Sequence, residues 1–314
     1  MARAPIRIVA QGEIAGGLKE PPAFRLPDAA SLFVDRAQRF DVLAALAAKA
    51  EGDAGFLRFM AKLARAQHSA LTKYVMPSAP SAEHLERSRQ HGLPPLNTDA
   101  PLNAAWRDAL AHIAREIRPD APVAARGVLD ALLAQNTAML DTQAQRLLSL
   151  DYPALDAAVV PFVGAALQVH WVKRAAALDE GAIRKLDVPT VCPVCGSPPV
   201  ASVLRIDVPV PGSRYLHCVL CSSGWYMTRG TCSQCETQEK LAYYHIENGE
   251  NGNQAVRAEA CDECKGYVKS LNHEKDPKAD PFADDLASLA LDLLMDESGY
   301  ERASPNYFFV PGQG

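Results

Sequence analysis

The sequence predicts an α+β protein with an N-terminal all-α helical bundle, two tandem small β modules of the rubredoxin-like or zinc-ribbon type, and a C-terminal helix. Two observations predict this fold class. Apolar residues recur three or four positions apart through most of the first half of the chain, as on the buried face of a helix. All eight cysteines then fall in four Cys-x-x-Cys pairs, separated by short β-branched segments.

This division gives four parts. We expect a helical domain over residues 1–187, a first four-cysteine metal ribbon over 188–229 and a second over 230–273. Residues 274–314 are expected to form an acidic C-terminal helix and tail that pack back on the body. A chain of 314 residues, 48% of them hydrophobic, is long enough to bury a core in two or three domains.

Helices are expected wherever apolar residues keep the helical spacing. Because proline disrupts a helix interior, the last helix of the N-terminal domain should be kinked or begin anew at Pro161. The segment Met76–Pro101 carries five prolines and is expected to be a loop with a short helix at Ala82–Arg89. The predicted helices are Ala30–Lys49, Gly55–Val75, Asn103–Ile117, Val123–Leu150, Ala154–Leu178 and Asp280–Asp296.

Strands are expected around the cysteine pairs, where β-branched and aromatic residues cluster. The segment Asn248–Gly252 is a strong turn signal between two of them. Ribbons of this size have almost no apolar core, so a bound metal should supply much of their folding free energy. The predicted strands are Pro199–Val210, Trp225–Thr228, Leu241–Glu247 and Ala255–Ala260.

The four cysteine pairs indicate metal binding. Each Cys-x-x-Cys turn aims two sulfurs at one point, and two such turns make the closed site typical of structural zinc or of a single rubredoxin-type iron. A disulfide framework suits a small secreted domain, and thioredoxin-like chemistry needs one pair rather than four in series, so both are disfavoured. The pairs are Cys192/Cys195, Cys218/Cys221, Cys232/Cys235 and Cys261/Cys264.

The gaps between the pairs suggest how they combine. Along the chain 22, 10 and 25 residues separate successive pairs, and the near-equal outer gaps suggest a repeated unit. The first site would then use Cys192, Cys195, Cys218 and Cys221, and the second would use Cys232, Cys235, Cys261 and Cys264. An interleaved arrangement, with the first pair joined to the third, stays open. Gly196 and Gly266 lie just after cysteine pairs, where the turn often needs positive φ. The positions equivalent to Gly196 in the second and third pairs are Ser222 and Glu236, which are not glycine.

Charge and composition disfavour several function classes. The net charge is −5, the pI is about 5.9, and no basic stripe follows the cysteines, which argues against a nucleic-acid binder. The most apolar run, Ala157–Val172, is too short to span a membrane. No signal peptide is expected in Met1–Gly17. A hydrolytic metalloenzyme is disfavoured, because closed four-cysteine sites leave no position for a catalytic water.

Four stretches around the cysteines carry a family resemblance. They read RYLHCVLCSSGWYMTRGTCSQC (Arg214–Cys235), LAYYHIENG (Leu241–Gly249), VRAEACDECKGYVKSLN (Val256–Asn272) and DPFADDLASLALDLLMDESGY (Asp280–Tyr300). The chain here resembles the FdhE family of formate dehydrogenase accessory proteins. The resemblance is specific over the cysteine region and the C-terminal helix, and looser over the helical front end.

The resemblance implies a cytoplasmic, non-enzymatic protein that assists the maturation of respiratory, molybdenum-dependent formate dehydrogenases. Such a protein contacts the catalytic subunit before its twin-arginine export. The family is associated with rubredoxin-type iron, so we expect two mononuclear iron sites, although spacing alone favours zinc, which remains the alternative. Two other functions stay open: a redox-active iron protein that passes electrons to the client, and a zinc-ribbon protein that binds nucleic acid.

Aromatic residues are concentrated around the cysteine pairs. They either pack on the metal hairpins and the helical domain or form a contact patch for a partner, since Trp and Tyr are favoured in binding hot spots. The candidate partner-contact residues are Tyr215, Trp225, Tyr226, Tyr243, Tyr244 and His245. Both roles stay open at this point.

Overall fold

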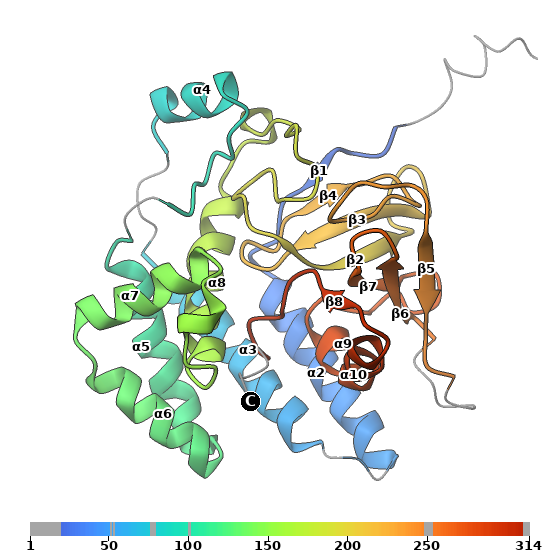
Figure 1. Cartoon of the computed structure of the whole chain (residues 1–314). Helices are drawn as coiled ribbons and strands as arrows, with labels where there is room; N and C mark the ends of the chain where they lie inside the picture. Colours follow the sequence, from blue (N-terminus) through green and yellow to red (C-terminus); the bar gives the residue numbers. More distant parts are fainter. Residues whose placement is uncertain are drawn as a thin grey trace, which may run out of the picture.

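The structure is a computed structural model that describes residues 20–50, 52, 54–75, 80–99, 102–247 and 254–309. The predictions for Met1–Gly17 and for the turn Asn248–Gly252 lie outside these residues. Helices from the first part of the chain gather on one side, and a sheet built from the later part lies on the other (Figure 1). The C-terminal segment runs back between them, next to the short helices α9 and α10 (Figure 1).

The described helices follow the predicted order. The α-helices are α2 (Leu32–Lys49), α3 (Gly55–Lys73), α4 (Ala82–Gln90), α5 (Ala105–Ile117), α6 (Val123–Ala134), α7 (Thr137–Leu148), α8 (Val160–Ala176), α9 (Ala283–Leu286) and α10 (Leu289–Glu297). Short 3-10 turns lie at η1 (Arg118–Asp120), η2 (Tyr152–Ala154) and η3 (Glu180–Ala182).

Helix α3 holds the helical layer together, because it packs against α2, α5 and α8. Its buried face is rich in alanine, and small side chains allow neighbouring helices to approach closely. Helix α8 is buried almost all round, from Val160 to Ala175. As predicted, it begins anew at Pro161, which lies in its first turn, where the missing N–H needs no partner.

The single helix predicted over Val123–Leu150 is wrong, because the chain breaks between α6 and α7. Gln135 takes an extended conformation with ψ 146°, which ends α6. The side chain of Asn136 then accepts a hydrogen bond from the backbone N–H of Met139 and caps the start of α7. The apolar spacing continues across the break, so periodicity alone does not reveal it.

The helix predicted over Asp280–Asp296 is also divided, into α9 and α10. The backbone carbonyl groups of Asp285 and Ser288 accept hydrogen bonds from the buried Lys269 Nζ, at 2.7 and 3.1 Å. The Ser288 hydroxyl donates to the carbonyl groups of Asp284 and Asp285. Side-chain donors therefore form hydrogen bonds to the backbone carbonyl groups at the junction, and these bonds stabilise the break between the two helices.

In the described part of the chain, eight strands form one sheet in the order β1-β4-β3-β2-β7-β6-β5, with β8 added beside β7. Strands β1, β3, β7 and β8 were not predicted. Strand β4 begins one residue earlier than expected, and β2 and β5 end earlier than expected, at Arg205 and Tyr244. The strands are β1 (Phe24–Arg25), β2 (Pro199–Arg205), β3 (Ser213–Cys218), β4 (Gly224–Tyr226), β5 (Leu241–Tyr244), β6 (Val256–Cys261), β7 (Gly266–Asn272) and β8 (Glu301–Arg302).

A parallel pairing joins the two predicted ribbons. Strand β2 of the first ribbon pairs with β7 of the second, with Val203 opposite Leu271. The other main pairings, β2–β3, β3–β4, β5–β6 and β6–β7, are antiparallel. The α+β fold class is therefore confirmed, and the two metal modules share one continuous sheet.

The expectation that the ribbons have almost no apolar core is wrong for the first ribbon. Its cysteines belong to the same buried cluster as the helices, which also includes Tyr307 and Phe308 near the C-terminus. Tyr307 lies so close to α8 that a Cβ added at Gly164 would be 2.8 Å from the Tyr307 Cβ. The second ribbon has a small cluster of its own, formed mainly by β6, β7 and α10.

None of the helices in the described residues combines the length and the apolar character that a bilayer crossing requires.

Candidate metal centres

Each of the four Cys-x-x-Cys turns ends in the same backbone conformation. The residue after the second cysteine has positive φ in every pair: Gly196 (82°), Ser222 (56°), Glu236 (62°) and Lys265 (56°). The left-handed conformation is therefore kept where the residue is not glycine. The fourth such position is Lys265 and not Gly266, so the predicted place of this conformation was one residue too late. Counting from the second cysteine of each pair would have located it.

Backbone hydrogen bonds repeat in the first three turns. The N–H of the first cysteine bonds to the carbonyl five residues later, from Cys192 to Ser197, from Cys218 to Ser223 and from Cys232 to Thr237, at 2.8–2.9 Å. Backbone N–H groups also point at the sulfurs: those of Val194 and Gln234 each lie 3.4 Å from the Sγ of the preceding first cysteine. Such bonds stabilise a thiolate over a thiol.

The eight cysteines form two groups, and each could hold one metal ion. The first cysteine group is Cys192, Cys195, Cys218 and Cys221, and the second cysteine group is Cys232, Cys235, Cys261 and Cys264. All eight cysteines are free of disulfide bonds. The structure brings the first pair together with the second, and the third pair together with the fourth.

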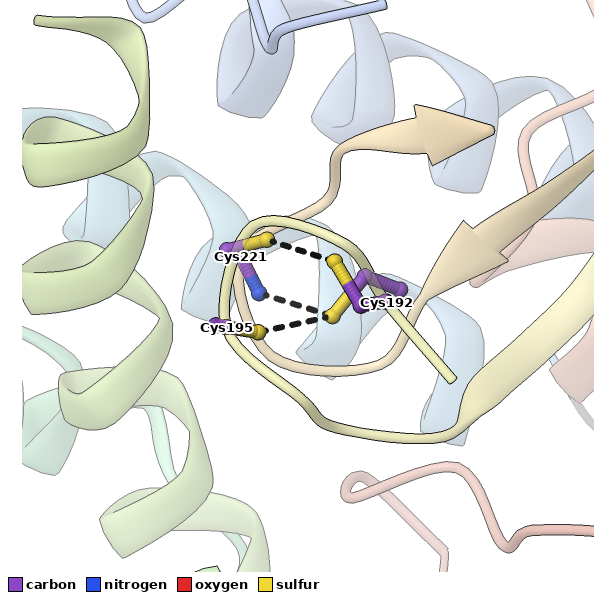
Figure 2. A group of neighbouring side chains, drawn as sticks. Cys192, Cys195 and Cys221 are labelled. Carbon is purple, nitrogen blue, oxygen red and sulfur yellow. Dashed lines mark hydrogen bonds between the residues drawn. The ribbon is translucent and has the colours of Figure 1, made fainter. Parts of the chain in front are cut away.

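The sulfur positions of the first cysteine group fit tetrahedral coordination. The Sγ atoms of Cys192 and Cys221 are 3.6 Å apart, and those of Cys195 and Cys218 are 3.4 Å apart. A tetrahedron with metal–sulfur bonds of about 2.3 Å has sulfur–sulfur edges of about 3.8 Å. Figure 2 shows the labelled sulfurs converging on one point. Zinc and rubredoxin-type iron both suit four thiolates in this geometry.

The first cysteine group is enclosed. Its four cysteines are 0–1% exposed, and burial raises the pKa of the thiols of Cys192 and Cys218. Helix α8 lies against it, and Gln168 on that helix donates a 2.8 Å hydrogen bond to the carbonyl of Val219. On the other side the N–H of Leu96 donates to the carbonyl of Val194 at 2.9 Å. A metal cation would offset the cost of ionising these buried thiols.

A buried arginine connects this group to α2. Arg36 is 1% exposed, and its guanidinium lies 3.3 Å from Asp280 and from the Gln168 side chain. It also reaches the Ser222 hydroxyl at 3.5 Å and stacks over the Phe282 ring, 3.9 Å from the ring centroid. The first cysteine group is thus connected to α2, α8 and the segment before α9.

The second cysteine group has similar distances and a different environment. The Sγ atoms of Cys232 and Cys264 are 3.7 Å apart, as are those of Cys235 and Cys261. Cys232 and Cys261 are 5% and 1% exposed, whereas Cys235 and Cys264 lie on the surface. This group therefore sits at the edge of the protein.

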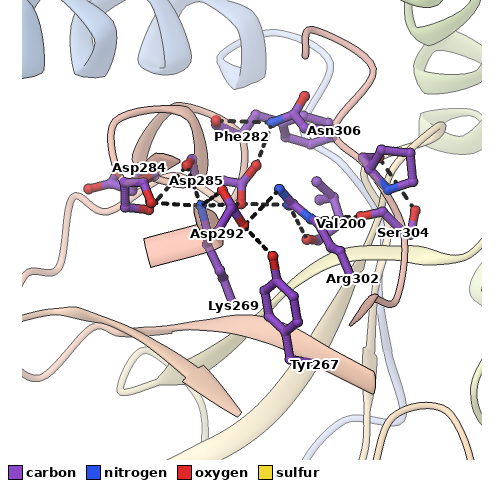
Figure 3. A network of polar contacts seen from close by, with 12 residues as sticks. Val200, Tyr267, Lys269, Phe282, Asp284, Asp285, Asp292, Arg302, Ser304 and Asn306 are labelled. Atoms are coloured by element: carbon purple, nitrogen blue, oxygen red, sulfur yellow. Dashed lines mark hydrogen bonds and ion pairs between the residues drawn. The ribbon is translucent and has the colours of Figure 1, made fainter. Parts of the chain in front are cut away.

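A polar network attaches the second ribbon to the C-terminal segments (Figure 3). Lys269 of β7 and Asp285 of α9 are both 0% exposed and form an ion pair of 3.3 Å. Asp285 also accepts from Arg302 of β8 at 2.5 Å and from Asn306 at 3.0 Å. Burial acts to raise the pKa of Asp285, but Arg302 and Lys269 outweigh it and hold the pKa below its ordinary value. Asp292 of α10 completes the network with Lys269 at 2.5 Å.

The candidate partner-contact residues fall into two sets. Tyr215 and Trp225 are 0% and 4% exposed, and their polar atoms bond to the carbonyl groups of Pro22 and Pro189. The partner-contact prediction is wrong for these two, because both side chains pack into the core. Tyr226 is half-buried and forms an edge-to-face contact with Tyr215.

Three candidates remain at the surface. Tyr243 is 47% exposed, Tyr244 is 38% exposed and the His245 side chain is 56% exposed. They lie on or next to β5, which pairs with β6 on one side and forms an edge of the sheet in the described residues. The guanidinium of Arg257 lies over the Tyr243 ring at 4.4 Å.

Comparison with known proteins decides the family. Three family models match consecutive parts of the chain: FdhE, N-terminal, over residues 21–187; FdhE, central domain, over 191–229; and FdhE, C-terminal domain, over 231–309. The chain belongs to the FdhE family. The cysteine pairs of the first group fall within the central model, and those of the second group fall within the C-terminal model.

Individual FdhE proteins are similar over nearly the full length. An FdhE homolog of Pseudomonas aeruginosa is 39% identical over 308 residues, which cover 97% of this chain and 98% of that protein. The FdhE protein of Escherichia coli K12 is 36% identical over 315 aligned residues, which cover 98% and 99%. The crystal structure of FdhE from Pseudomonas aeruginosa superposes with a TM-score of 0.83 at 37% identity, covering 93% of this chain and 100% of that one.

Proposed function

We propose that this FdhE-family chain is a non-catalytic accessory protein that binds the catalytic subunit of a molybdenum-dependent formate dehydrogenase during maturation. The binding takes place in the cytoplasm, before the subunit is exported by the twin-arginine route. The observation that carries the proposal is the pair of closed four-sulfur groups on an FdhE scaffold. Four protein ligands per ion leave no position for a substrate or an activated water, which supports binding rather than catalysis.

Each cysteine group holds one mononuclear metal ion in this proposal. Iron is the proposed metal, by the family resemblance, and zinc is the alternative that the same four thiolates accept. When bound, the ion fixes the relative positions of two hairpins that lie 22 or 25 residues apart in the sequence. The chain's own contribution is the set of N–H groups that point at the sulfurs and the four left-handed turn residues.

The surface around β5 is the proposed contact site for the client. Tyr243 and Tyr244 on β5, and His245 just after it, present exposed aromatic area at a sheet edge of the described residues. Tyrosine contributes large contact area at low entropic cost, and a free strand edge offers backbone groups to an extended segment of a partner. A binding partner that recognises only the immature subunit holds it back from premature export by mass action.

Direct binding measurements test this proposal. The purified chain should associate with the cofactor-free catalytic subunit of formate dehydrogenase, and more weakly with the mature subunit, as measured by biolayer interferometry. Replacing Tyr243 and Tyr244 with alanine should weaken binding by about thirtyfold, equivalent to about 2 kcal/mol for a hot spot. The matched control is Phe309→Ala, since Phe309 is 42% exposed elsewhere on the surface. Equal binding of both subunit forms, or none, would contradict the proposal.

The exposure of Cys235 and Cys264 favours a second candidate function, electron transfer to the client. A metal ion held partly by surface thiolates lies near enough to solvent to exchange electrons with a bound partner. Iron-loaded protein should then show thiolate-to-iron visible bands that bleach on reduction and return on oxidation. Zinc as the resident metal would exclude this function, because zinc is redox-inactive.

A further inference from the structure

The two cysteine groups have similar sulfur geometry and opposite accessibility. The four cysteines of the first group are 0–1% exposed, whereas Cys235 and Cys264 of the second group are exposed. We propose that the second cysteine group is an exchangeable, thiol-reactive metal site, and that the first group retains its ion for the life of the fold. This inference rests on the metal binding in the proposed function and assigns different roles to the two sites.

The first cysteine group can be reached only by opening the main core. Val194, Val219 and Leu220, which lie in its two hairpins, are all 0% exposed. The hydrogen bond from Gln168 to Val219 holds α8 over one hairpin, and that from Leu96 to Val194 holds a loop over the other. A chelator or thiol reagent must wait for both covers to separate, and such sub-global opening of a core is rare.

The second cysteine group needs no such opening. Cys235 and Cys264 are exposed residues, whereas Cys232 and Cys261 are buried on the inner side of the group. The side chain of Gln234 lies beside the exposed Cys264, with its Oε1 3.9 Å from Cys264 Sγ. A donor atom of a chelator can replace the Cys264 thiolate and then the Cys235 thiolate, and each released thiolate takes up a proton from water.

Contacts around this group connect it to the β5 surface. Tyr300 Oη lies 2.9 Å from the Asp262 carboxylate, inside the fourth cysteine turn, and 3.2 Å from Tyr244 Oη on β5. The carbonyl of Lys240, just before β5, accepts from the N–H of Asp262 at 2.9 Å. These contacts place the fourth cysteine turn beside Tyr244 on the proposed client-contact surface.

Metal release from the full chain tests this inference. Protein loaded with zinc at both groups is mixed with excess EDTA and N-ethylmaleimide, and metal content and alkylated cysteines are followed by native and peptide mass spectrometry. One zinc should leave at least about a hundredfold faster than the other, equivalent to about 2.8 kcal/mol. Alkylation should reach Cys232, Cys235, Cys261 and Cys264 in this fast phase. Equal release rates, or early alkylation of Cys192 or Cys218, would overturn the inference.

Two variants separate this result from a failure of the proposed function. Cys264→Ser should keep one zinc per chain and remain folded, whereas the matched Cys218→Ser should lose structure together with its zinc. If Cys218→Ser cannot be purified in folded form, the release and alkylation rates of the unmodified chain are sufficient to test the difference between the two groups. A chain that takes up no metal at all refutes the metal binding in the proposed function. Two zinc ions that leave at one rate refute only the division of roles.

Discussion

Replacing Lys269 with methionine should destabilise the protein strongly. Lys269 is fully buried, and its Nζ donates to the carbonyl groups of Asp285 and Ser288 and to the Asp292 carboxylate at 2.5–3.1 Å. The variant leaves Asp285, also 0% exposed, with Arg302 and Asn306 only. Breaking a buried ion pair on one side costs about 3–5 kcal/mol.

Thermal unfolding of the zinc-saturated chain measures this effect. With an unfolding entropy of roughly 2.1 cal/mol/K per residue, the loss should lower the melting temperature by about 5–8 °C. The matched control is Lys62→Met, because Lys62 is 44% exposed and pairs with the exposed Asp120 at 3.0 Å. That variant should lose less than about 1 kcal/mol. Equal melting temperatures for Lys269→Met and Lys62→Met would refute the assigned role of the network.

Three further substitutions test other parts of the structure. Gly164→Ala should lower the free energy of unfolding in urea by about 1–3 kcal/mol, because the new Cβ would lie 2.8 Å from the Cβ of Tyr307. The control Gly127→Ala, on the open surface of α6, should raise it by up to about 1 kcal/mol. Burial, together with Arg174, lowers the pKa of His170 to about 3, so the free energy of unfolding should fall as the pH drops from 6.5 towards 3. In His170→Phe the decrease should be smaller by about 1.4 kcal/mol per pH unit. An unchanged pH dependence in the variant would contradict the assigned burial of a neutral His170. Trp225→Ala should cost about 3–5 kcal/mol, since the side chain is 4% exposed; a stable variant would indicate a contact role instead.

The two groups of cysteines in the structure are the ones that the spacing along the chain suggests. A Cys-x-x-Cys turn is a short, self-contained unit, so its two sulfurs converge whatever surrounds them. The near-equal gaps of 22 and 25 residues gave the pairing that the structure shows. The positive φ after each second cysteine belongs to the turn geometry, which explains why Ser222, Glu236 and Lys265 adopt it without being glycine.

What the sequence could not predict depends on contacts between distant segments. The parallel pairing of β2 with β7 joins the two ribbons, and no local pattern distinguishes it from two separate modules. The burial of the first cysteine group requires α8 and Tyr307, which lie far from it in the sequence. Nothing in the local sequence distinguishes Lys269 from an ordinary surface lysine, because its acidic partners come from α9 and α10. The break between α6 and α7 could have been predicted from the sequence, since Asn136 is a residue type that commonly caps a helix start.

The metal content of the full chain tests the central claim most directly. Protein purified without air should carry two metal ions, as counted by elemental analysis and native mass spectrometry, with all eight cysteines reduced. The double variant Cys235→Ser with Cys264→Ser should carry one ion, held by the first cysteine group. Iron at both groups would add thiolate-to-iron visible bands, and zinc would leave the protein colourless. A chain that carries no metal, or that contains disulfides among these cysteines, would contradict the account.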